Sequence, residues 1–251
     1  MIRKLILIFI ALSFFSVCFA GSIQDMHKAA IARKKSGDPC TVMGASGTYV
    51  LWANADYPGD VHYACKDSGT GVDATAEVAG VAVVGGKING TYGYLLNAAN
   101  EHVRWDCPSN TIDAEGTIEM QITVPATTNG DTSLAEIYTD SQNYIYVYFS
   151  NTSGLIYGGI KGSDAHQVNE GVAVSDGTSY TILYTWRTTG TEKHCTSVNG
   201  GVGWTCQTED LTAFAGTTDD IAVGDDQNGN WSITDSWKVD DFKVREGYEG
   251  D

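Results

Sequence analysis

The alternation of apolar and polar residues between residues 85 and 248 constrains the fold of this chain more than any other feature. The stretches that alternate are separated by glycine turns, and the last of them is Trp237-Lys-Val-Asp-Asp-Phe-Lys-Val244. An alternating stretch places its apolar side chains on one face of a β-strand, so that this face can be buried while the other meets water. We therefore predict an all-β fold in which two antiparallel sheets pack as a sandwich.

Two of these stretches predict which side chains share a face. In 144–149 the tyrosines alternate with Ile145, Val147 and Phe149, and one of the two sets must face the core. Core packing and an exposed ligand platform both stay open for the tyrosines. In 180–186 the buried face is predicted to consist of Tyr180, Ile182, Tyr184 and Trp186.

Residues 1–20 are typical of a secretory signal peptide. Arg3 and Lys4 precede an apolar run, and small residues occupy the positions before a predicted cleavage after Ala20. The run is too short and poorly flanked for a membrane span. Acylation of Cys18 is the alternative, although Val17 does not suit lipoprotein processing. We expect a secreted or extracellular protein.

A short basic amphipathic helix is predicted within residues 21–39. Ser22 can cap a helix that extends to Lys35, and Gly37-Asp38-Pro39 would end it. This segment either docks on the acidic domain or serves as an arm that joins copies into a homo-oligomer. Residues 40–251 are assigned to one sandwich domain, in which 40–84 would add an outer hairpin or edge.

The charge of the chain excludes some partners. Its formal net charge is −16, from 15 basic and 31 acidic residues. Nucleic acids and anionic membranes are bound through stripes of Lys and Arg, so we expect neither as a partner. Solubility outside the cell explains the acidity, and weak Ca²⁺ binding is compatible with it.

The cysteines predict disulfides, because an exported chain meets an oxidising compartment. Cys195 and Cys206 flank the turn signal Asn199-Gly200-Gly201, which places them on adjacent antiparallel strands. We expect a disulfide between them and a second one between Cys40 and Cys65. The spacings do not resemble those of a zinc site.

From residue 85 onward the sequence contains several short motifs in a fixed order. They are Gly86-Lys-Ile-Asn-Gly90, Glu115-Gly-Thr-Ile-Glu119, Asp176-Gly-Thr-Ser-Tyr180, Ile221-Ala-Val-Gly224 and Val239-Asp-Asp-Phe-Lys-Val244. In their order and spacing these motifs resemble laminin-G-like domains of the concanavalin A-like lectin and glucanase superfamily, over about two thirds of the chain. The resemblance implies a two-sheet antiparallel jelly roll.

We do not expect the protein to be an enzyme. Retaining glycosidases need two carboxyl groups about 5–5.5 Å apart. Glu115 and Glu119 share a strand face at a distance of about 13 Å, from roughly 3.3 Å per residue, and the Glu-x-Asp-x-x-Glu motif of the related glucanases is missing. The sequence also lacks Gly-x-Ser-x-Gly.

Carbohydrate binding needs an aromatic face beside convergent polar groups. The candidate ligand-binding residues are Trp231, Asn228, Asn230, Tyr144 and Tyr146. Hard oxygen ligands suit Ca²⁺, and the candidate metal ligands are Asp225, Asp226, Asn228 and Asp140.

Three functions therefore remain open. The leading one is a secreted, non-catalytic recognition module that binds an extracellular glycan or protein. The second is a structural or assembly subunit of a cell-surface, fibre or virion structure. The third is a degenerate glycanase whose acids would be Glu115 and Glu119.

Overall fold

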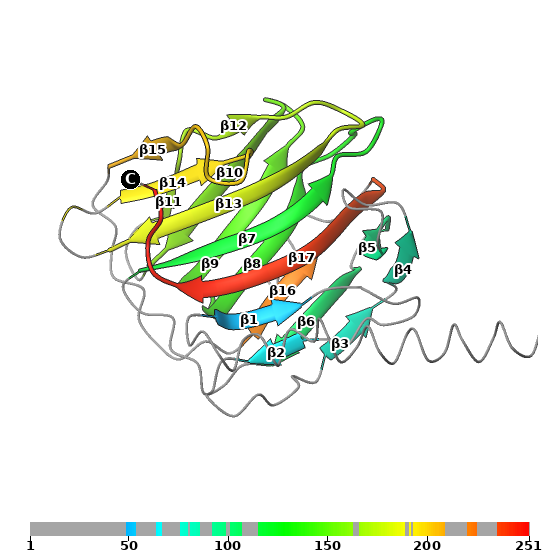
Figure 1. Cartoon of the computed structure of the whole chain (residues 1–251), viewed down its shortest axis with the longest axis horizontal. Coiled ribbons are helices and arrows are strands. Elements are labelled where there is room, and N and C mark those ends of the chain that lie inside the picture. The colour runs from blue at the N-terminus through cyan, green and yellow to red at the C-terminus, as the bar shows by residue number, and fades with distance from the viewer. Residues whose placement is uncertain are drawn as a thin grey trace, which may run out of the picture.

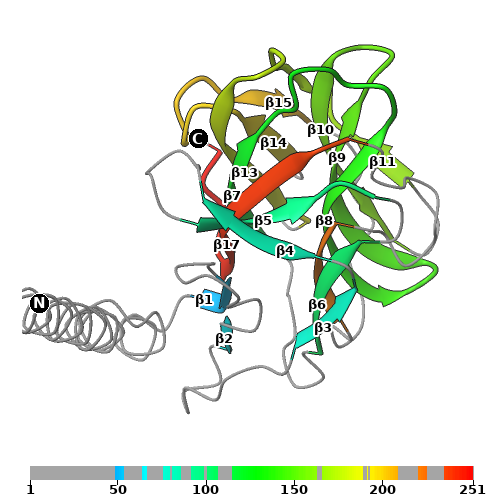
Figure 2. The ribbon, with the colours of Figure 1, turned by 90° about the vertical axis from the view of Figure 1, so that its right-hand side faces the viewer.

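The computed structural model contains two antiparallel β-sheets that lie face to face (Figures 1 and 2). It describes residues 49–53, 64–66, 76–79, 81–85, 92–98, 101–106, 115–162, 166–188, 191, 193–208, 220–224 and 235–250. The prediction of an all-β sandwich is confirmed. The signal peptide, the helix within 21–39 and Cys40 fall outside the described residues.

Sheet A has nine strands within the described residues. Seven of them follow one another in the order β15 (Thr205–Gln207), β14 (Lys193–Ser197), β13 (Ser179–Arg187), β7 (Glu115–Thr123), β17 (Trp237–Glu246), β1 (Tyr49–Ala53) and β2 (Ala64–Lys66). β5 (Tyr92–Leu96) pairs with β17 and with β4 (Ala82–Gly85).

Sheet B has eight strands in the same part of the chain. Their order is β11 (His166–Val168), β10 (Leu155–Lys161), β9 (Asn143–Ser150), β8 (Thr132–Asp140), β16 (Asp220–Gly224), β6 (His102–Asp106) and β3 (Ala76–Ala79), with β12 (Val172–Ala173) on β10. Strands adjacent in sequence, such as β8, β9 and β10, pair directly, whereas β16 returns from far along the chain to lie between β8 and β6.

β17 changes partner at a bulge. Along one edge its first residues pair with β5 and its last residues pair with β1, while β7 runs along the other edge. The register with β7 shifts between Asp240 and Lys243, and Asp241 in this interval has a φ of 48°. An extra residue in one strand bends it locally, so the bulge lets one long strand serve two partners.

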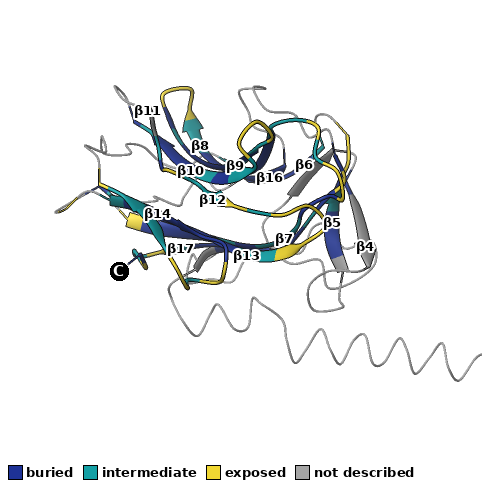
Figure 3. Cartoon of the chain, turned by 90° about the horizontal axis from the view of Figure 1, so that it is seen from above, coloured by how far each residue is buried: buried dark blue, intermediate teal, exposed yellow. Residues whose placement is uncertain are grey.

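Aromatic side chains join the inner faces of the two sheets. Trp105 of sheet B stacks on Phe242 of sheet A at 5.9 Å between ring centroids, and Phe149 of sheet B meets Trp237 of sheet A at 5.1 Å. All four are buried, and the buried segments of both sheets face one another (Figure 3). Each such side chain contributes on the order of 1.5–3 kcal/mol through burial.

The predicted faces of two strands can be compared with the structure. On β13, Ile182, Tyr184 and Trp186 are fully buried in the core, as predicted, and Tyr180 packs against it. On β9, Ile145, Val147 and Phe149 belong to the core. The tyrosines of β9 therefore lie on the outer face of sheet B.

A buried polar cluster joins β10 to β14 at one end of the sandwich. The Asn169 side chain accepts a hydrogen bond from the Gly158 backbone N–H at 3.1 Å and donates one to Thr196 Oγ1. Next to it the Tyr184 hydroxyl is 3.2 Å from His194 Nδ1. Burial lowers the pKa of His194 from 6.5 to about 4, so the folded protein holds this ring neutral.

We predict that acid destabilises the protein through His194. The unfolded chain protonates this ring near its ordinary pKa of 6.5, whereas the folded protein does so only near 4. Stability is therefore lost as the pH falls through this interval, by roughly 3 kcal/mol. Urea unfolding at several pH values measures the loss, and His194→Gln should flatten this part of the profile. If the free energy of unfolding fell equally steeply with pH in the variant and the wild type, the assignment of this loss to His194 would be wrong.

We predict that Gly158→Ala destabilises the sandwich by about 1–3 kcal/mol through overpacking. A Cβ at Gly158 would lie 1.9 Å from Cδ2 of the buried Tyr184 ring in the opposite sheet. Thermal or urea unfolding measures the effect, and Thr152→Ala in the exposed turn after β9 is the control. Wild-type stability of Gly158→Ala would show that the sheets are not so closely packed.

Candidate functional site: the tyrosine row on sheet B

Four tyrosines form a continuous row on the outer face of sheet B. They are Tyr144, Tyr146 and Tyr148 of β9 and Tyr157 of β10, and we call them the tyrosine row. Successive ring centroids are 5.7, 5.6 and 5.1 Å apart. Alternation on β9 places three rings on one face, and the cross-strand pairing of Tyr148 with Tyr157 extends the row to β10.

The middle ring of the row is packed differently from the others. Tyr146 is 1% exposed, whereas Tyr144, Tyr148 and Tyr157 are half-buried. The residue that faces Tyr146 on β10 is Gly159, and a Cβ there would lie 2.3 Å from Tyr146 Cζ. The absence of a side chain at Gly159 thus lets the Tyr146 ring lie against the sheet.

Polar groups surround the row at both ends. At one end Lys161 Nζ lies 5.4 Å from the centroid of the Tyr144 ring and donates to the Ser141 carbonyl at 2.8 Å. At the other end the Tyr157 hydroxyl donates to Ser153 Oγ at 3.0 Å. The row therefore offers ring surface between hydrogen-bonding groups, which is the combination that sugars require.

Burial alters the acidity of two hydroxyls in the row. It raises the pKa of Tyr148 to about 12, with Tyr157 and Asp131 adding to the effect. Burial also raises the pKa of Tyr146, by more. Both hydroxyls are therefore protonated at neutral pH, so these two rings carry no charge of their own.

A carboxylate lies beside the row on β8. Glu136 pairs with Tyr146 across the β8–β9 ladder and with Ala222 across the β16–β8 ladder, so all three share the outer face. Glu136 is 1% exposed. Tyr138, two residues further along β8, pairs with Tyr144 and widens the aromatic surface.

The predicted metal ligand Asp140 forms the turn between β8 and β9. Its Oδ1 accepts hydrogen bonds from the backbone N–H groups of Gln142 at 2.7 Å and Asn143 at 3.0 Å. These hydrogen bonds lower the pKa of Asp140, and the bond from Gln142 has the largest effect. Among the described residues no group of three or more His, Cys, Asp and Glu side chains is placed to hold a metal ion.

Five other predicted site residues lie outside the described part of the chain, namely Asp225, Asp226, Asn228, Asn230 and Trp231. Their assignment to a ligand or Ca²⁺ site stays a prediction. What the sequence did not reveal is the part played by Gly159 and Tyr157, because both join the row through strand pairing.

The two glutamates considered for catalysis lie on β7 in sheet A. Glu119 is bound to two cations, Lys243 at 3.0 Å and Arg245 at 3.2 Å. Burial opposes the charge on Lys243, but Asp241 and Glu119 outweigh it and raise the pKa of Lys243. Glu119 is therefore held in a surface ion-pair network, while Glu115 is exposed at the start of the strand.

Two further predictions can be compared with the described residues. The disulfide between Cys195 and Cys206 is confirmed, and the two residues are direct partners on β14 and β15. Cys65 lies in β2, and its predicted partner Cys40 is not described. No helix in the described part of the chain is both long and apolar enough to span a membrane.

Comparison with solved structures identifies the fold. Domain 4 of AbnA, a GH43 extracellular arabinanase from Geobacillus stearothermophilus, in complex with arabinotriose, is similar with a TM-score of 0.59 and 14% identity. The match covers 80% of this chain and 93% of that domain. No protein-family model and no curated protein sequence matches the chain.

The binding domain of botulinum neurotoxin serotype D is similar with a TM-score of 0.59 and 12% identity. The match covers 80% of this chain and 49% of that one. A structure of botulinum neurotoxin type C, whose cell entry depends on interaction with two ganglioside molecules, is similar with a TM-score of 0.57 and 10% identity. The match covers 83% of this chain and 49% of that one.

This chain thus spans about half the length of the neurotoxin domains. At such low sequence identities the structural similarity shows the fold alone, a two-sheet sandwich of the jelly-roll type. The particular likeness to laminin-G-like domains stays a prediction.

We predict that Gly159→Ala displaces the Tyr146 ring without disturbing the core, because the new methyl group lies on the outer face. The exposed ring should then show a pKa closer to the ordinary value of 10.0. Titration of the tyrosine ring carbons by NMR measures this shift, with Thr152→Ala as the control. An unchanged Tyr146 titration would show that the ring does not depend on Gly159.

Proposed function

We propose that the protein is a secreted, non-catalytic recognition module that binds extracellular carbohydrate on the tyrosine row. The observation that carries the proposal is that four tyrosine rings, each in contact with the next, lie on the outer face of sheet B and that three of them stay partly exposed. Burying tyrosine would have added core packing, so the outward orientation leaves ring surface for another use.

The half-buried rings are the contact surface in this proposal. Tyr144 and Tyr148 are four residues apart on one strand, which corresponds to about 13 Å along β9. Tyr146 between them supports both rings without facing the solvent. A ligand that uses both contacts must therefore be extended along the strand, as an oligosaccharide is and a single sugar is not.

The charge of the chain favours a neutral glycan. A formal net charge of −16 repels polyanionic sugars at distances within the screening length of the salt solution. Lys161 lies beside the row, and it is engaged with the Tyr144 ring and the Ser141 carbonyl. Binding of arabinotriose by the similar domain of AbnA supports a sugar ligand, and the proposal extends this to the present chain.

The proposal includes secretion, the absence of catalysis and a contribution from Ca²⁺ in the 225–231 segment. Residues 1–20 support export, and the ion pairs of Glu119 with Lys243 and Arg245 argue against its use as a catalytic acid. Asp225 and Asp226 supply the hard oxygens that Ca²⁺ prefers. A glycan array probed with and without a chelator tests the ligand and the metal together.

We predict that Tyr148→Ala weakens binding of the best array ligand at least about tenfold, because a buried aromatic contact is lost. Tyr148→Phe should bind more tightly than Tyr148→Ala, since it keeps the ring. Isothermal titration calorimetry measures the affinities, with folding checked by circular dichroism.

Tyr248→Phe, whose ring lies over sheet A, is the matched control and should bind like wild type. Equal affinities for Tyr148→Ala and wild type would remove the tyrosine row from the site. A glycan array with no signal in either condition would contradict carbohydrate recognition itself.

A further inference from the structure

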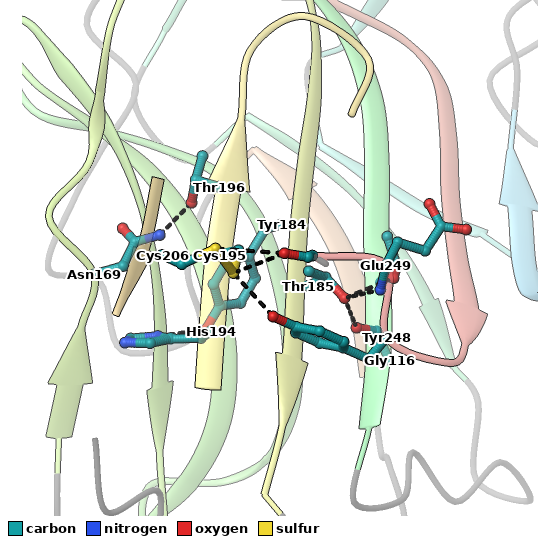
Figure 4. Close-up of a disulfide and its surroundings, with 12 residues drawn as sticks. Gly116, Asn169, Tyr184, Thr185, His194, Cys195, Thr196, Cys206, Tyr248 and Glu249 are labelled. Carbon is teal, nitrogen blue, oxygen red and sulfur yellow. Dashed lines mark hydrogen bonds between the residues drawn. A yellow bond between two sulfur atoms is a disulfide. The ribbon is translucent and has the colours of Figure 1, made fainter. Parts of the chain in front are cut away.

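The end of the chain crosses the outer face of sheet A. Residues 247–250, which we call the C-terminal strap, leave β17 and run back over β7 and β13 toward β14 (Figures 1 and 4). The Gly247 carbonyl accepts a hydrogen bond from Thr117 Oγ1 on β7 at 2.7 Å, and the Glu249 N–H donates to Thr185 Oγ1 on β13 at 3.0 Å. Both threonines are fully buried.

The strap ends directly on the Cys195–Cys206 disulfide (Figure 4). The Tyr248 hydroxyl is 3.1 Å from Cys195 Sγ, and the Gly250 carbonyl oxygen is 3.6 Å from Cys206 Sγ and 3.8 Å from Cys195 Sγ. A Cβ at Gly250 would lie 2.7 Å from Cys195 Sγ. The sulfur atoms thus form part of the surface on which the strap packs, and Gly250 lies too close to Cys195 Sγ to accommodate a side chain.

The two cysteine residues differ in exposure. Cys195 is 0% exposed, whereas Cys206 is half-exposed. Cys206 lies on β15, a strand of three residues at the edge of sheet A that pairs only with β14 among the described strands. Of the two residues, Cys206 is therefore the one that a thiolate from solution can approach, since it is partly exposed on a strand that ends the described part of sheet A.

We propose that this disulfide is a site of thiol exchange at Cys206 and that its redox state controls the C-terminal strap. The reaction partner is a low-molecular-weight thiol or a dithiol protein. The proposal rests on the strap contacts and on the unequal exposure of the two cysteines, and it is independent of carbohydrate binding.

The exchange proceeds in two steps. An external thiolate attacks Cys206 Sγ and forms a mixed disulfide, while the bond to Cys195 breaks and Cys195 leaves as a thiolate. The Tyr248 hydroxyl is placed to donate a hydrogen bond to that thiolate. A second external thiolate then attacks the external sulfur, so two external thiols become one disulfide, and their two protons pass to the two cysteines of the protein.

Reduction of the disulfide disrupts the surface on which the C-terminal strap packs. Two sulfurs that are no longer bonded must move apart to a non-bonded distance, and Gly250 and Tyr248 leave them no space. The short β15 strand also loses its covalent link to β14 and keeps only three register pairs. The strap is held by its hydrogen bonds to the buried Thr117 and Thr185. The Arg187 guanidinium, 4.5 Å from the Tyr248 ring centroid, and the Arg245–Glu249 ion pair add contacts nearer the surface.

Hydrogen exchange of the full chain before and after reduction with dithiothreitol tests the proposal. We expect the Glu249 amide to exchange at least about tenfold faster after reduction, while amides of β7 and β13 keep their protection. Cys195→Ser/Cys206→Ser should reproduce the reduced protein. Unchanged Glu249 exchange overturns the proposal, as does loss of protection throughout sheet A, which would show that the disulfide holds the fold and not the strap.

Two variants separate the strap from the disulfide. Gly250→Ala should lift the strap with the disulfide intact, so that reduction causes no further change in Glu249 exchange. Tyr248→Phe should slow reduction by dithiothreitol several-fold, because the departing Cys195 thiolate loses its hydrogen-bond donor; an equal or faster rate overturns the role of Tyr248. Val202→Ala, at the exposed tip of the β14–β15 hairpin, is the matched control and should match wild type in both assays.

Discussion

The aromatic contacts between the two sheets are the interaction on which the rest of this structure depends. Trp105 with Phe242 and Phe149 with Trp237 each join a strand of sheet B to β17 of sheet A. Because these large rings fill the space between the sheets, the inner faces are fixed in register, and the outer faces become free for other uses. The tyrosine row and the C-terminal strap occupy those two outer faces.

Sequence alternation predicted the sandwich and the buried face of β13, but it could not decide between the two faces of β9. Both faces of 144–149 consist of large side chains, so size and polarity favour neither. Strand pairing decides, because it sets Gly158 against Val147 on the inner face and Gly159 against Tyr146 on the outer face. Such pairing is a tertiary property and has no local signal.

The disulfide was predictable and the strap was not, for a related physical reason. Cys195 and Cys206 flank a glycine turn, and a hairpin fixes the register of its own strands. Residues 247–250 have no periodicity, and their position follows from contacts with Thr117 and Thr185, more than 60 residues away in sequence. Isolated hydrogen bonds of this kind leave no pattern in a sequence.

Two adjacent glycines show how one short segment serves both the fold and the candidate site. At Gly158 the inward direction is filled by the Tyr184 ring of the opposite sheet, and at Gly159 the outward direction is filled by the Tyr146 ring of the neighbouring strand. Glycine in a strand interior costs stability, by roughly 0.5–1 kcal/mol relative to alanine. Here each glycine admits an aromatic ring that would otherwise be displaced. One accommodates the core and the other the tyrosine row, so the local cost in strand stability is offset on both faces of sheet B.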